Sequence, residues 1–79
     1  MTNIEKYKKT FLESLAIDQK SLTEELKYND IPEWDSIGHM TLMSNLEEEF
    51  SINIETDDIV DFSSYKKGIE ILKKYKIII

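Results

Sequence analysis

Residues 35–50 read DSIGHMTLMSNLEEEF, and this stretch decides the fold that the sequence predicts. It contains no proline, and Gly38 is its only residue that strongly weakens a helix. Asp35 or Ser36 supplies the short polar side chain that caps a first helical turn. Apolar residues recur at helical spacing and form a core-facing stripe, namely Leu42, Met43, Leu46 and Phe50. The stretch therefore predicts an amphipathic helix over residues 36–50.

The segments on either side of this stretch predict three more helices. The first covers residues 2–15 and opens with the Thr-x-x-Glu spacing of a capping box. The third is short, covers residues 56–62 and has an acidic first turn. A fourth, capped by Ser63 or Ser64, ends among lysines and buries one face, made of Tyr65, Ile69, Leu72 and Tyr75. We therefore expect an all-α fold in one domain, residues 1–79, arranged as a four-helix bundle with a short third helix.

A long loop, residues 16–35, connects the first two predicted helices. Isolated apolar residues anchor this loop to the bundle, and Trp34 is interpreted as one such anchor and only secondarily as a partner contact. Asn29-Asp30 and Ile31-Pro32 are turn and breaker signals. Loops of this length are uncommon in compact domains unless they are functional or partly structured. We therefore expect a helical turn around residues 21–26.

The charged residues are distributed unevenly along the chain. The net charge is −6, and residues 30–61 hold ten acids and no base, while the ten lysines are accompanied by no arginine. A negative segment of this kind repels nucleic acid phosphates and anionic lipid, and it attracts a basic surface on another protein. We therefore expect protein partners with basic surfaces, no nucleic acid and no membrane insertion. The alternative is that the acids only keep the domain soluble.

The residue types exclude several kinds of chemistry. The chain has no cysteine and one histidine, so it has no thiolate nucleophile and too few partners for a zinc site. Asp57, Asp58 and Asp61 lack the spacing of a calcium loop and are interpreted as a capping acid and a solvated face. His39 is interpreted as a half-buried structural histidine. We therefore expect neither an enzyme nor a metal site.

Two features bear on where the chain works. The longest apolar run is residues 77–79, far short of the roughly 20 residues that cross a bilayer. The N-terminus is polar and charged from Thr2 onward, unlike an export signal. We therefore expect a cytoplasmic protein, and we expect it to be a monomer.

The predicted second helix has another face opposite its core stripe. This face combines large apolar residues with polar and acidic ones, namely Ile37, Met40, Thr41, Glu47 and Glu48. Apolar anchors with a charged rim are typical of a protein-docking surface. The alternative is that Ile37 and Met40 tuck under the long loop, because the arithmetic of a helix face ignores what covers the helix.

Several short motifs follow one another in a fixed order. Asp-Ser-Ile at residues 35–37 opens the helix, Leu-Glu-Glu-Glu-Phe at residues 46–50 ends it, and Ile52-x-Ile54 and Asp57-Asp58-Ile59 follow. This order of motifs resembles the acyl carrier protein family. The family signature is Asp-Ser-Leu, or Ile or Met in the third place, at the head of the second helix, often with Leu-Glu-Glu-Glu-Phe at its end. The resemblance covers nearly the whole chain and implies a carrier.

The resemblance also assigns roles to individual residues. It implies that Ser36 is the attachment point for phosphopantetheine, which a phosphopantetheinyl transferase takes from coenzyme A, and that the thiol of this arm carries an acyl or aminoacyl group as a thioester. Asp35 would cap the helix and help position the metal and coenzyme A of the transferase. An acyl chain would be sheltered in a groove between the second and third helices, lined by Met43, Leu46, Ile54, Ile59 and Phe62.

Some positions depart from the family pattern. Carriers of fatty acid synthesis usually bear acids where this chain has Gly38 and Thr41, and an apolar residue where it has Ser44. The departures favour a specialised pathway over housekeeping fatty acid synthesis, such as modification of a surface sugar, a polyketide or a lipid, or aminoacyl transfer. The partners would be the transferase and the enzymes that load and transfer acyl groups. The alternative function is a small acidic helical adaptor or regulator that binds a basic protein without a prosthetic group.

Overall fold

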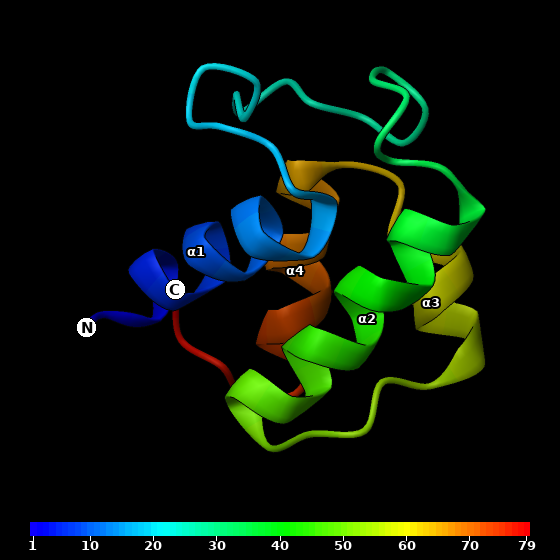
Figure 1. The fold of residues 1–79 in the computed structure, drawn as a ribbon. Coiled ribbons are helices and arrows are strands. Elements are labelled where there is room, and N and C mark those ends of the chain that lie inside the picture. The colour runs from blue at the N-terminus through cyan, green and yellow to red at the C-terminus, as the bar shows by residue number, and fades with distance from the viewer.

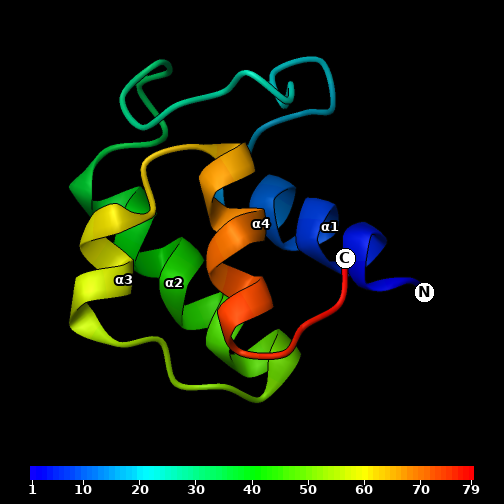
Figure 2. The ribbon, with the colours of Figure 1, turned by 180° about the vertical axis from the view of Figure 1, so that it is seen from behind.

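The computed structural model describes residues 1–79 and contains four helices and no strand. The helices are α1 (Asn3–Leu15), α2 (Ser36–Phe50), α3 (Thr56–Asp61) and α4 (Tyr65–Lys74). The long loop between α1 and α2 runs across the end of the molecule at which α2 and α4 begin (Figure 1). The two chain ends lie side by side (Figure 2), where the Asn3 side-chain amide donates a hydrogen bond to the Ile78 carbonyl over 2.8 Å. The all-α prediction is confirmed.

The ends of the helices follow from capping residues. α2 has the predicted bounds, and Asp35 rather than Ser36 is its cap, because a carboxylate oxygen of Asp35 accepts the Gly38 N–H over 2.8 Å. α1 begins one residue later than predicted because Thr2 is its cap, in a complete capping box with Glu5. Ser64 caps α4 by accepting the Lys67 N–H over 2.9 Å. Three of the four helices therefore begin at capping side chains that the sequence predicts.

The long loop contains turns and no helix, so the predicted helical turn around residues 21–26 is wrong. The Leu26 N–H donates to the Thr23 carbonyl in an isolated turn. The Leu26 carbonyl accepts the Tyr65 N–H, and the Tyr28 N–H donates to the Ser63 carbonyl, each over 2.9 Å. This pairing satisfies backbone groups of residues 26–28 and holds the end of the segment against the connection between α3 and α4.

Aromatic side chains form the centre of the core. The Phe11 ring on α1 lies 5.2 Å from the Tyr7 and Trp34 rings, measured between centroids, and 5.3 Å from that of Tyr65. The Phe62 ring follows at 6.2 Å. The Trp34 side chain is fully buried, which confirms it as an anchor of the loop. The aromatic cluster thus joins α1, the loop and the start of α4.

The buried face of α4 differs from the predicted one. Tyr65 and Leu72 are buried as expected, but Ile71 is also buried, while Ile69 and Tyr75 are only partly buried. Gly68 explains the difference. A Cβ atom at Gly68 would overlap side-chain atoms of Phe62 and Tyr7, so α4 turns its glycine toward the core and approaches it closely.

Asp58 corrects another prediction, because it does not lie on a solvated face. Only 5% of Asp58 is exposed, whereas Asp57 and Asp61 are exposed as expected. One carboxylate oxygen of Asp58 pairs with the Lys74 ammonium over 2.6 Å, and the other accepts the Tyr75 hydroxyl over 2.5 Å. The Lys74 hydrogen bond and then that of Tyr75 hold the pKa of Asp58 below its ordinary value of 3.8. Asp58 therefore ties α3 to the end of α4.

The pKa shift of Asp58 predicts how stability depends on pH. Because the pKa is lower in the folded state, the carboxylate stabilises the fold fully above pH 3.8 and stops doing so as the pH falls through the folded pKa. We expect Asp58→Asn to unfold at lower urea concentration than the wild type at pH 7, and to lose less stability on acidification. Urea unfolding between pH 7 and pH 3 measures both effects. Asp57→Asn is the matched control and should behave as the wild type, whereas equal stability of all three proteins would contradict this role.

Candidate functional site

Ser36 is the first residue of α2, and its side chain is exposed. Its hydroxyl oxygen lies 3.1 Å from the Tyr28 hydroxyl, so the two side chains share a hydrogen bond. The first N–H groups of a helix have no carbonyl partners within the helix, and Asp35 satisfies only that of Gly38. The site therefore combines an accessible hydroxyl with the positive end of a helix dipole.

Gly38 brings the loop directly against the first turn of α2. A Cβ atom at this position would overlap the Glu33 carbonyl oxygen and would also lie 3.1 Å from a methyl group of Leu15. Any side chain here would push the loop away from the helix. The identity of Gly38 therefore follows from packing, and the missing acid at this position says little about the charge of a docking face.

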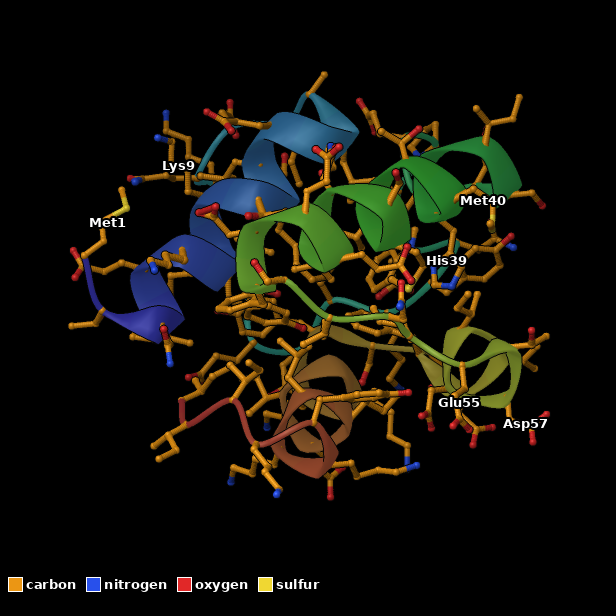
Figure 3. The ribbon with its side chains drawn as sticks, turned by 90° about the horizontal axis from the view of Figure 1, so that it is seen from below. Met1, Lys9, His39, Met40, Glu55 and Asp57 are labelled. Carbon is orange, nitrogen blue, oxygen red and sulfur yellow. The ribbon has the colours of Figure 1, made fainter.

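His39 connects three parts of the molecule beside Ser36. The Trp34 indole N–H donates to Nδ1 of His39 over 3.0 Å, and Nε2 of His39 lies 2.8 Å from the Ile59 carbonyl. Since Nδ1 accepts, the ring proton is on Nε2, which donates to Ile59. Figure 3 shows the His39 ring on the side of α2 that faces α3. His39 is half-buried and structural, as the sequence predicts.

The predicted docking residues at the start of α2 are open to solvent. Ile37 is 79% exposed and Met40 is 55% exposed, so the alternative that the loop covers them is wrong. Thr41 is exposed too, and its hydroxyl donates to the Ile37 carbonyl over 3.1 Å. Met40 lies at the edge of the first turns of α2, next to His39 (Figure 3). Ile37 and Met40 thus form an apolar patch within about one turn of Ser36 on the helix surface.

The two predicted docking acids lie in different surroundings. Glu48 is exposed, whereas Glu47 is half-buried. A carboxylate oxygen of Glu47 accepts the Ile54 N–H over 2.8 Å and so fixes the connection between α2 and α3. The Glu48 carboxylate is therefore accessible to a partner, whereas the Glu47 carboxylate already forms a structural hydrogen bond within the protein.

The predicted acyl groove is closed in this structure. Met43, Leu46, Ile54 and Phe62 are buried in the core, and Ile59 is partly buried. A surface hollow of about 250 Å³ lies beside this set and shares two of its residues; its lining is Tyr28, His39, Ile59, Val60, Phe62 and Ser63. The hollow is mainly apolar and includes Tyr28, the residue that contacts Ser36.

Sequence reasoning missed Tyr28. Helical periodicity links residues on one helix, but Tyr28 lies in the loop, eight residues before Ser36, where no periodicity applies. The only signal in the sequence is an aromatic hydroxyl within a polar loop.

The structure contains no group of three or more His, Asp or Glu side chains that could hold a metal ion. None of its helices is both long and apolar enough to cross a membrane.

Comparison with known proteins identifies the family. No family model matches the chain. The chain is 32% identical over 75 residues to proteins named acyl carrier protein from Buchnera aphidicola subsp. Acyrthosiphon pisum, strains Tuc7 and APS. Each alignment covers 94% of this chain and 94% of the relative. Acyl carrier proteins are carriers and not enzymes. With this identity over nearly its whole length, the chain belongs to the acyl carrier protein family.

Proposed function

We propose that this protein carries an acyl or aminoacyl group as a thioester on a phosphopantetheine arm attached to Ser36. The observation that carries the proposal is the exposed Ser36 hydroxyl at the start of α2, in a chain of the acyl carrier protein family. A carrier needs its attachment point outside the core and at a defined place. Ser36 satisfies both conditions.

The residues around Ser36 fit a phosphodiester. The hydroxyl is accessible, and its one hydrogen-bond partner is Tyr28. A phosphodiester here would carry its negative charge at the N-terminus of a fifteen-residue helix, where the helix dipole and free N–H groups favour an anion. No lysine or arginine is needed on this chain for that purpose.

Loading is a substitution at phosphorus. The Ser36 Oγ atom attacks the phosphorus of coenzyme A that bears the pantetheine, and a new O–P bond forms. The bond from this phosphorus to the bridging oxygen breaks, adenosine bisphosphate leaves, and the serine proton passes to a base on the transferase. The arm then supplies a thiol that holds the cargo as a thioester. Because the chain has no cysteine, this is the only thiol on the carrier.

Asp35 has two roles in this proposal. It caps α2 and so fixes the first helical turn, to which Ser36 belongs. Its exposed carboxylate also helps position the metal ion and the coenzyme A of the transferase during loading. Both roles use the same side chain, because a carboxylate that accepts one N–H still has lone pairs to offer.

The partners we propose are a phosphopantetheinyl transferase and enzymes that load or transfer acyl groups. The apolar anchors for these enzymes are Ile37 and Met40, with Thr41, Glu47 and Glu48 beside them on the helix. The acidic middle of the chain attracts basic enzyme surfaces. Thr41 and Ser44 make this face less acidic and less apolar than that of fatty acid carriers, which favours a specialised pathway.

Ser36→Ala tests the attachment point. We expect the variant to gain no phosphopantetheine, because the nucleophile is gone, and to keep its fold, because Asp35 caps the helix. The lost bond to Tyr28 is worth about 1 kcal/mol. Intact mass after incubation with coenzyme A and a broad-specificity transferase reports loading, and circular dichroism reports the fold. A mass gain on the variant would show that Ser36 is the wrong residue, and no gain on the wild type would favour the adaptor.

Acyl cargo tests the groove. An acyl chain can enter the groove only by displacing packed side chains such as Met43 and Leu46, which then enclose it. A ligand held only by the folded state stabilises that state. We therefore expect a medium acyl chain on the arm to raise the melting temperature above that of the unacylated carrier, and a short polar or aminoacyl cargo to raise it little. Equal melting temperatures for all forms would contradict sheltering.

Salt dependence tests the docking face. Glu48→Lys reverses an exposed charge on α2, the helix that begins at Ser36, and should slow association with a basic transferase. The association rate of the wild type should fall as the salt concentration rises. Ile37→Ala should instead speed dissociation, with little dependence on salt. Stopped-flow binding at several salt concentrations separates the two effects.

The control for the docking face is Lys73→Glu on α4, which is exposed and outside every ion pair of the structure. Lys74 is unsuitable because it pairs with Asp58. Lys73→Glu should load as the wild type does. If Glu48→Lys also associates at the wild-type rate in low salt, the acidic residues serve solubility and recognition lies elsewhere.

A further inference from the structure

Tyr28 is the one side chain that forms a hydrogen bond with the Ser36 hydroxyl, and core packing does not explain the Tyr28 hydroxyl. The Tyr28 ring is partly buried, and its hydroxyl reaches the surface at Ser36, 3.1 Å from Oγ. A phenylalanine would fill the same space against the core. The hydroxyl is therefore the part of Tyr28 that needs an explanation.

The structure holds the Tyr28 hydroxyl in place from two directions. The Tyr28 N–H donates to the Ser63 carbonyl, which fixes the backbone against the connection between α3 and α4. The ring packs edge-on against Trp34 and His39, with centroids 6.1 Å and 5.4 Å away. Both of these neighbours are themselves linked by the indole hydrogen bond. The position of the hydroxyl thus follows from contacts that do not involve Ser36.

We propose that Tyr28 is the positioning residue of the modification site: its hydroxyl holds Ser36 before loading and donates a hydrogen bond to the phosphodiester afterwards. The inference rests on the proposed attachment at Ser36. Before loading, either hydroxyl can donate to the other. After loading, Oγ carries phosphorus in place of hydrogen and can only accept, so Tyr28 becomes the donor. The negative charge lies on the non-bridging oxygens of the phosphodiester, next to Oγ, and a hydrogen bond from the Tyr28 hydroxyl to one of them is stronger than one between two neutral hydroxyls.

The same contact gives the arm a direction. The Tyr28 ring forms one wall of the apolar hollow that also includes Ile59 and Val60. A phosphodiester held by the Tyr28 hydroxyl therefore starts the arm on the side of this hollow.

Tyr28→Phe tests the proposal, because it removes the hydroxyl and keeps the ring. Tyr65→Phe is the matched control: it is the same chemical change, at a buried hydroxyl that has no hydrogen-bond partner. Each full-length protein is loaded with phosphopantetheine, and phosphorus NMR records the resonance of the phosphodiester. We expect Tyr28→Phe to shift this resonance, while Tyr65→Phe leaves it at the wild-type position and both variants keep the wild-type helical circular dichroism.

Two further measurements use the same proteins. Loading of Tyr28→Phe should have a kcat/KM reduced about two- to tenfold, the range that one hydrogen bond spans. Methyl resonances of Ile59 and Val60 should move on loading of the wild type and move less on loading of Tyr28→Phe. A merely structural role for Tyr28 would leave the phosphorus resonance unchanged between the loaded forms.

The outcomes separate this inference from the proposed function. If wild type and Tyr28→Phe are both loaded and give identical phosphorus and methyl spectra, Tyr28 does not position the arm, and the carrier function stands. If the wild type gains no phosphopantetheine from the transferase, the proposed function fails first. A loaded wild type whose phosphodiester resonance depends on the Tyr28 hydroxyl supports both.

Discussion

The bond from the Trp34 indole to His39 is the interaction on which the arrangement of this small protein depends. Trp34 is buried in the core at the end of the long loop, and its indole N–H donates to His39 of α2. The other ring nitrogen of His39 donates to the Ile59 carbonyl of α3. A buried indole N–H without an acceptor would cost about 1–3 kcal/mol, so the loop, α2 and α3 adopt positions that satisfy it. Such a central contact matters for the stability of this chain, because its core is small and it has no disulfides.

The helices were predictable because their signals are local. Capping side chains precede α1, α2 and α4, and apolar residues at helical spacing identify the inner face of α2. The burial of Asp58 was not predictable, because its partners Lys74 and Tyr75 lie on a different helix and their proximity is a tertiary fact. The same holds for Gly68, whose closeness to Phe62 rotates α4 relative to the expected face.

The candidate site divides in the same way. Ser36 and Asp35 were identifiable from a short motif at a helix start, where sequence and geometry correspond closely. Tyr28 was not, since a loop that crosses the bundle has no period by which to place a residue. Glu47 shows the intermediate case: the sequence predicts it on the outer face of α2, but it is half-buried, because its hydrogen bond with the Ile54 N–H depends on the path of the following connection.

The burial of Trp34 has an optical consequence. It is the only tryptophan of the chain, so the indole fluorescence of the whole protein arises from one position, at the junction of the loop with α2. The imidazole of His39 accepts the N–H of this indole. The ring of Tyr28, whose hydroxyl forms a hydrogen bond with Ser36, packs edge-on against the indole. The emission spectrum of the unlabelled protein therefore reports on the immediate surroundings of the proposed modification site, without any dye attached to the protein.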